Sequence, residues 1–268
     1  MKIKVAHECP ISVLSMSPAW SDFDYALVHL FETHPHYLAY FLNAKRLYQR
    51  EVLLDNSIFE LGHAFDPKKY MGWIDKLQPN MTIVPDVLED SRGTRESWTA
   101  FTRLDGYSNI TAKKIGAVQG KTWTDILDCY KFMADNADMI AISFDFSYYT
   151  ITGEGRTKLE QMCSGRQRLI EQLIDRGAWE WSKPHHLLGC SLAREFRYYV
   201  DHNIHNIVSC DTSNPVVAGL NNLRYDADYG LTTKPSVKLA DLIDTLVSDE
   251  QLEIINYNVN QFKQIIRR

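Results

Sequence analysis

Short, almost continuously apolar segments alternate along this chain with segments of helical periodicity. Continuous apolar runs of four to eight residues are typical of strands covered on both faces of a parallel sheet. We predict strands at residues 11–16, 52–55, 81–86, 115–119, 139–143, 186–190 and 207–211, with a less regular eighth at 226–231.

Helix start and stop signals lie between the predicted strands. Asp66-Pro67 offers an N-cap and a first-turn proline, and Thr122 precedes Asp125 by three residues, as in a capping box. Gly177 follows an apolar stripe and is typical of a helix end, while Ser248-x-x-Gln251 begins the last predicted helix.

Eight strands that alternate with helices in 268 residues favour an α/β fold, a compact (β/α)8 barrel of the TIM type, over an open doubly wound sheet. We therefore predict one barrel domain over residues 1–268, with C-terminal helices at about 236–267. No Gly-x-Gly-x-x-Gly motif follows a predicted strand and the sequence has no Walker loop, so we expect no cofactor.

Charge and hydropathy restrict the possible partners. The 29 basic and 34 acidic residues give a net charge of −5, so any nucleic acid must bind to a local basic patch. No apolar run approaches the roughly 20 residues that cross a bilayer, and the first ten residues lack an apolar leader. We expect a cytoplasmic protein without a membrane partner, in the host cytoplasm if it is encoded by a phage.

The five cysteines are scattered and include no Cys-x-x-Cys pair, which predicts neither a disulfide framework nor a zinc cluster. We interpret Cys190 and Cys210 as small buried hydrophobes. The histidine pairs, among them His185-His186, lack Cys or Glu at zinc spacing, so we expect surface or capping histidines and no metal site.

Polar side chains stand at the ends of several predicted strands. In a barrel the carboxyl ends of the strands converge on the face that carries the active site. Two carboxylates there can act as nucleophile and acid/base, the equipment for substitution at a sugar C1′. The alternative is that each residue only caps a helix or forms a turn. The residues concerned are Asp55, Asp86, Gln119, Ser143 and Asp211.

Four short motifs resemble, in the same order, the signatures of tRNA-guanine transglycosylases. Leu54-Asp55-Asn56-Ser57-Ile58-Phe59-Glu60 resembles Asp-Ser-Gly-Gly-Phe-Gln, and Gly116-Ala117-Val118-Gln119-Gly120 resembles Gly-Ile-Val-Gln-Gly. His186-Leu187-Leu188-Gly189 resembles Tyr-Leu-Met-Gly, and Ser209-Cys210-Asp211-Thr212 falls where the family has Phe-Asp-Cys. The resemblance spans about residues 52–215.

This resemblance implies that Asp211 is the nucleophile that displaces guanine from C1′ and carries the covalent sugar. It implies that Asp55 is the general acid/base for the leaving and incoming bases. In the same way Asp86, Gln119 and the backbone of Ser143 and Phe144 would read the base edge, Phe59 and Leu188 would sandwich its ring, and Gly189 would complete the substrate-binding set.

Two departures point to a particular branch of the family. No cysteine follows Cys210, so the zinc subdomain with which the tRNA enzymes grip tRNA is absent. Phage and bacterial DNA 7-deazaguanine transglycosylases are compact, and their runs Leu-Asp-Asn-x-x-Phe-Glu and Pro-Asp-Val are similar to residues 54–60 and 85–87. The resemblance thus implies a pentosyltransferase that replaces guanine in DNA with a 7-deazaguanine and so marks DNA against restriction nucleases.

The expected partners are DNA and the free 7-deazaguanine base, with a homodimer or an accessory subunit also possible. Three alternatives remain open: tRNA as the acceptor, a non-catalytic barrel subunit that helps a partner bind nucleic acid, and a glycoside hydrolase with the same carboxylates. Basic residues could form a phosphate track or only solvated faces, and Tyr148 and Tyr149 could support an extruded nucleotide. The basic clusters are Lys45, Arg46 and Arg50; Lys113 and Lys114; and Arg156, Lys158, Arg166 and Arg168.

Overall fold

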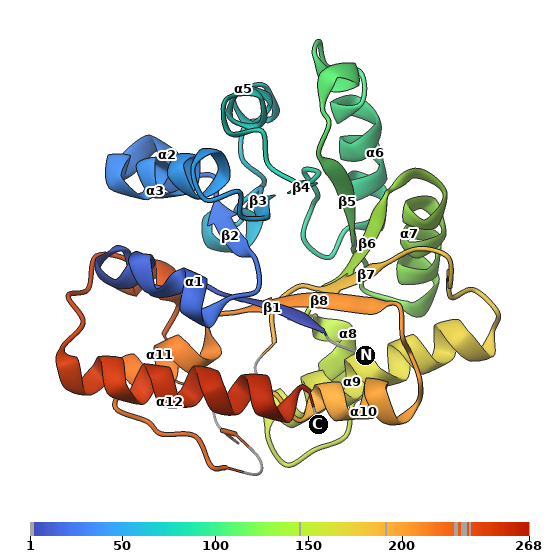
Figure 1. Ribbon diagram of the computed structural model, residues 1–268. Coiled ribbons are helices and arrows are strands. Elements are labelled where there is room, and N and C mark those ends of the chain that lie inside the picture. Colours follow the sequence, from blue (N-terminus) through green and yellow to red (C-terminus); the bar gives the residue numbers. More distant parts are fainter. Residues whose placement is uncertain are drawn as a thin grey trace. The chain divides into compact units, whose positions relative to one another are not determined.

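The chain has an α/β fold of the (β/α)8, TIM-barrel type, as the sequence predicted. Eight strands alternate with helices along the chain and pair in parallel (Figure 1). The computed structural model describes residues 3–144, 146–190, 192–227, 230–231, 235 and 237–267. It divides into two compact units, one made of Met1–Asp22 with Phe144–Arg268 and the other of Phe23–Ser143.

The second unit, Phe23–Ser143, contains five parallel strands that are neighbours in sequence order. They are β2 (Asp24–Leu27), β3 (Val52–Asp55), β4 (Met81–Ile83), β5 (Lys113–Val118) and β6 (Met139–Ile142). The helices between them are α2 (Leu30–Thr33), α3 (Pro35–Arg46), α4 (Ile58–Leu61), α5 (Pro67–Leu77), α6 (Ser91–Phe101), the 3-10 turn η2 (Tyr107–Asn109) and α7 (Trp123–Asn136).

The hydroxyl of Tyr70 ties two strands of this unit together from α5. It lies 2.8 Å from the carbonyl oxygen of Leu54, 2.8 Å from Oγ1 of Thr82 and 3.0 Å from the carbonyl oxygen of Ile83. Burial raises the pKa of this phenol well above its usual range. The contacts fix the carboxyl ends of β3 and β4; Asp55 is the last residue of β3, and Asp86 follows β4 in the chain.

The first unit contains β1 (Lys4–His7), β7 (His185–Leu187) and β8 (Ile207–Thr212), with β8 between the other two. Its helices are η1 (Ile11–Met16), α1 (Ser17–Trp20), α8 (Ser147–Thr152), α9 (Lys158–Asp175), α10 (Glu195–Asp201), α11 (Asn214–Leu220), η3 (Leu239–Leu242) and α12 (Asp249–Ile265).

The helix caps confirm the predicted starts. The side chain of Asp66 accepts a hydrogen bond from the Lys69 amide at 2.8 Å, and Thr122 accepts from Asp125 at 3.2 Å. Ser248 and Gln251 form a full capping box at the start of α12. Each cap satisfies amides that the first helical turn leaves without a partner.

One predicted strand is not a strand in the structure, and two strands of the structure were not predicted. Residues 11–16 form the 3-10 helix η1 rather than a strand, because a six-residue apolar run is compatible with either conformation. Strands β1 and β2 were missed, since each is four residues long and carries a charged residue in its first position. The predicted strand at 226–231 lies partly outside the described residues, and within it Asp226 and Gly230 form an isolated antiparallel bridge.

All five cysteines are buried, and none of them forms a disulfide. Burial raises the pKa of Cys129 to about 11 and also raises the pKa values of Cys190 and Cys210. The interpretation of Cys190 and Cys210 as buried hydrophobes is confirmed. No helix within the described residues has both the length and the apolar composition needed to cross a membrane.

Candidate active site

In the second unit, a buried chain of hydrogen bonds joins the ends of β3, β4 and β5. The carboxylate of Asp86 accepts from Nδ2 of Asn56 at 2.8 Å on one oxygen and from Nε2 of Gln119 at 2.6 Å on the other. The side-chain oxygen of Gln119, Oε1, accepts from the backbone amide of Glu89 at 2.8 Å. The structure therefore brings Asp86 and Gln119 together.

Opposing effects act on the pKa of Asp86. Burial raises this pKa above the ordinary carboxyl value, because desolvation disfavours the charge, while the hydrogen bonds from Asn56 and Gln119 lower it. Burial is the largest of these effects. A carboxyl group of this kind can accept hydrogen bonds from a ligand and can also retain a proton above the usual range.

Asp55 ends β3 and is held by the turn that follows it. Its Oδ2 accepts from the backbone amide of Ser57 at 2.7 Å, and Ser57 adopts a left-handed backbone conformation with φ 60°. The hydroxyl of Ser57 accepts in turn from the amide of His29 at 3.3 Å. Ser57 stands where the resembled motif has its first glycine, and its positive φ is the conformation that glycine adopts most readily.

The other predicted residues of this unit are less enclosed. Phe59 lies on the one-turn helix α4 with 44% of its surface exposed. Ser143 follows β6 and is half-buried.

In the first unit, the carboxylate of Asp211 receives three hydrogen bonds at the end of β8. Nε2 of His186 lies 2.9 Å from Oδ1, and the amide of Gly189 lies 3.2 Å from Oδ1 and 3.2 Å from Oδ2. Gly189 has a φ of 66°, which turns its amide back toward β8. Asp211 is thus buried but well supplied with donors.

His186 is the functional candidate that the sequence interpretation missed. It was expected at the surface or at a cap, but it is fully buried in β7, and its Nδ1 lies 2.8 Å from the hydroxyl of Ser209. The Cα of His186 pairs with that of Ser209 in the parallel register. The available signal was its position three residues before Gly189, where the resembled motif has tyrosine.

A buried ion pair supports the loop that carries Gly189. The guanidinium of Arg166 forms two bonds with Glu195, at 2.7 and 2.8 Å, and donates to the carbonyl oxygens of Leu188 and Gly189 at 3.2 and 3.0 Å. The interpretation of Arg166 as part of a phosphate track is wrong, because its side chain is fully buried. The ring of Phe144 lies under the same guanidinium, with 4.9 Å between the ring centroid and Cζ.

Leu188 is half-buried beside Gly189, and Phe144 is buried. Tyr149 is also fully buried, with its ring stacked on Phe146 at a centroid distance of 5.3 Å, so it is not placed to support an extruded nucleotide. The hydroxyl of Tyr148, also in the core, donates to Gln172 at 3.2 Å.

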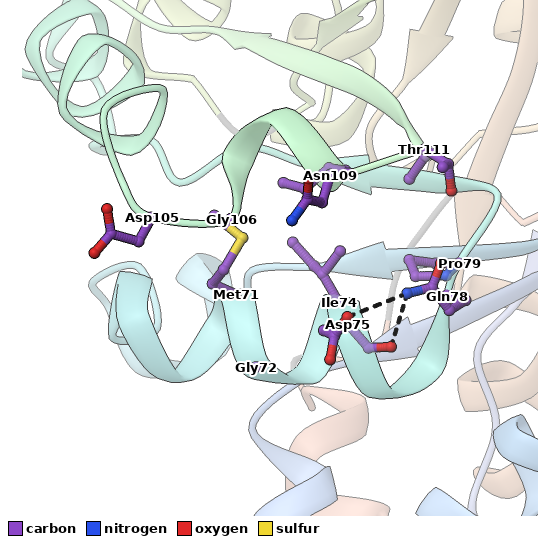
Figure 2. Close-up of a pocket in the computed structure, with 12 residues that line it drawn as sticks. Met71, Gly72, Ile74, Asp75, Gln78, Pro79, Asp105, Gly106, Asn109 and Thr111 are labelled. Atoms are coloured by element: carbon purple, nitrogen blue, oxygen red, sulfur yellow. Dashed lines mark hydrogen bonds between the residues drawn. The ribbon is translucent and has the colours of Figure 1, made fainter.

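A cavity of about 330 Å³ in the second unit is separate from the predicted residues (Figure 2). It lies between α5 and the segment before β5, where Met71, Ile74 and Asn109 face it. Gln78 closes one side and donates to the carbonyl oxygen of Asp75 at 2.8 Å. The cavity is at the amino ends of β4 and β5, the side of this fold class that serves stability rather than catalysis.

Among the described residues, no three His, Cys, Asp or Glu side chains gather closely enough to hold a metal ion. No family model matches the chain, and no curated protein matches it. The established classification is the fold: an α/β chain of the (β/α)8, TIM-barrel type.

Proposed function

We propose that the protein is a base-exchange transglycosylase that replaces guanine in DNA with a 7-deazaguanine through a covalent aspartyl-sugar intermediate on Asp211. The observation that carries the proposal is the setting of Asp211 at the end of β8. Donors from His186 and Gly189 occupy Oδ1, whereas Oδ2 receives only the longer bond that it shares with Oδ1. A positioned carboxylate with one lightly bonded oxygen suits a nucleophile.

The proposal also requires an acid/base. In the (β/α)8 class, catalytic residues come from the carboxyl ends of several strands. Asp55 ends β3, as Asp211 stands at the end of β8, and the amide of Ser57 fixes its Oδ2. Asp55 is the residue proposed to protonate the departing base.

The proposed reaction has two half-reactions. Oδ2 of Asp211 forms a bond to C1′ while the C1′–N9 bond breaks, its electron pair passes to guanine, and Asp55 supplies the proton that guanine takes up. In the second half, the ring nitrogen of the 7-deazaguanine attacks C1′ and loses its proton to Asp55. The bond between C1′ and Oδ2 breaks, and the electron pair returns to the carboxylate.

The pair Asp86 and Gln119 suits recognition of the base. A guanine edge offers N–H donors and a carbonyl acceptor, for which a carboxylate and an amide NH2 are complementary. Without a ligand these two side chains bond to each other at 2.6 Å. Binding would therefore exchange one internal hydrogen bond for contacts with the base. The exposed ring of Phe59 is proposed to stack on it.

The test is exchange of radiolabelled guanine with separate samples of duplex DNA, single-stranded DNA and tRNA. We expect label in DNA, none with Asp211→Asn, and full activity with Asp201→Asn, which removes an exposed carboxylate on α10. A protein–DNA adduct that survives denaturing electrophoresis should form with the wild type and be absent from Asp211→Asn.

The remaining outcomes distinguish the alternatives. Label in tRNA alone would assign the tRNA reaction. DNA binding without label or adduct would favour a non-catalytic subunit, and cleavage of aryl glycosides that Asp211→Asn abolishes would favour a glycoside hydrolase. Full exchange by Asp211→Asn would exclude the covalent mechanism.

A further inference from the structure

We propose that His186 is a positioning residue that carries its proton on Nε2, donates it to Oδ1 of Asp211 and so reserves Oδ2 as the attacking oxygen. This inference rests on the proposed function for the reaction, whereas the placement of the proton rests on the geometry of the first unit alone.

The proton assignment follows from the atoms that face one another. An ionised carboxylate only accepts hydrogen bonds, so the ring nitrogen 2.9 Å from Oδ1 of Asp211 must carry a hydrogen. In the neutral ring Nδ1 is then an acceptor, and the hydroxyl of Ser209, 2.8 Å away, can donate to it. The opposite tautomer would place a lone pair of the fully buried ring against a lone pair of the carboxylate.

The backbone of β8 explains why a single ring reaches both partners. Ser209 and Asp211 are two residues apart on one strand, so their side chains leave the same face. The neighbouring strand β7 places His186 in register with Ser209. The imidazole can therefore bridge the hydroxyl and the carboxylate with its two nitrogens.

Arg166 and Glu195 hold in place the loop of Gly189, whose amide is the second donor to Asp211. Arg166 binds the carbonyl oxygen of Gly189, whose amide donates to Asp211, and Glu195 holds Arg166 through two bonds. His186 contacts Oδ1 alone and the Gly189 amide is shared between the two oxygens, so Oδ2 is the less occupied oxygen and the one left for C1′.

The same donors serve both half-reactions. Once Oδ2 is bonded to C1′, Oδ1 becomes the carbonyl oxygen of an ester and keeps its contacts. When that ester breaks, negative charge returns to a carboxylate whose donors are already oriented, which is how fixed hydrogen bonds accelerate such steps. The proton stays on Nε2 throughout.

The first measurement needs no substrate. Long-range 1H–15N spectra of the histidine-labelled full chain report which ring nitrogen carries the proton, and the signal of His186 is assigned by its loss in His186→Gln. We expect a protonated Nε2 whose resonance shifts in Asp211→Ala. A proton on Nδ1 alone would overturn the proposal whether or not the protein exchanges bases.

The second measurement compares two amide substitutions. The amide nitrogen of glutamine reaches the position of Nε2, whereas that of asparagine reaches the position of Nδ1. We expect His186→Gln to retain kcat within about 10-fold and His186→Asn to lose about 100-fold, the usual effect of one missing donor, with KM unchanged in both. Equal losses in two folded variants would overturn the positioning role. If the wild type exchanges no base, the proposed function fails and the spectra alone decide the tautomer.

Discussion

Nε2 of Gln119 lies 2.6 Å from Oδ2 of Asp86, and Asn56 supplies the donor to the other carboxylate oxygen. All three side chains are buried, so each polar atom must be the donor or the acceptor that its neighbour requires. The amide of Gln119 therefore contributes to stability as well as to the proposed recognition of a base.

Gln119→Glu should destabilise the protein by about 2 kcal/mol, because it replaces a donor with an acceptor opposite Asp86 in a buried site. Urea denaturation monitored by circular dichroism measures this change in the free energy of unfolding. Gln49→Glu, at an exposed position, is the control and should leave the free energy of unfolding within about 0.5 kcal/mol of the wild-type value. Equal midpoints for both variants would contradict the buried network.

The ion pair of Arg166 and Glu195 predicts strong coupling. Arg166→Met should cost about 3 to 5 kcal/mol, because it leaves the carboxylate of Glu195 buried without its cation. The double variant Arg166→Met/Glu195→Met should regain most of that loss, as urea midpoints would reveal. Arg92→Met breaks an exposed pair with Glu96 and should change stability by less than about 1 kcal/mol. Additive losses in the double variant would disprove the coupling.

Two buried histidines predict acid sensitivity. Burial lowers the pKa of His7 and of His185 to about 3, against an unfolded value of 6.5. Between these values the unfolded chain binds more protons, so stability is full above pH 6.5 and falls as the pH drops toward 3. Each group contributes a slope of about 1.4 kcal/mol per pH unit in that window.

His7→Phe tests this dependence, since the His7 ring packs edge-on against Phe262 and neither ring nitrogen has a hydrogen-bond partner among the described residues. The variant should fold and lose less stability than wild type between pH 6 and pH 4. The exposed His36→Gln should follow the wild-type curve. Parallel curves for His7→Phe and wild type would refute the assignment.

The turn after Asp55 predicts a contrast at Ser57. Ser57→Gly removes the strain of a left-handed serine but also the contact with the amide of His29, so stability should change by less than about 1 kcal/mol. Ser57→Val loses the same contact and places a branched side chain at positive φ, which should cost about 2 kcal/mol or more. Thermal melts distinguish the two, and a valine variant as stable as the glycine variant would argue against the strain.

The sequence predicted the strands from β3 to β8 because their apolar runs are near-continuous. It did not predict β2, whose first residue, Asp24, is buried and paired with the Arg50 guanidinium at 2.7 Å. Hydropathy cannot register a partner 26 residues away in the sequence.

In the candidate site, too, residues at strand ends could be predicted from the sequence, whereas contacts that depend on tertiary packing could not. Asp55 and Asp211 could be placed at strand ends from local pattern alone. The pairing of His186 with Asp211 depends on the register of two strands, and the burial of Arg166 depends on Glu195 on another helix. Such relationships are properties of the packed chain rather than of any segment.

Because all five cysteines are buried, their reaction with a thiol reagent would report local unfolding of the chain. A thiol reagent reacts with the thiolate form of an accessible cysteine. In the folded protein the sulfurs are buried, and burial raises the pKa values of thiols such as Cys190 and Cys210, so little thiolate forms. Labelling followed by mass spectrometry would therefore time the opening of individual segments. Cys129 reports on α7, Cys163 on α9, and Cys210 on the strand that carries Asp211.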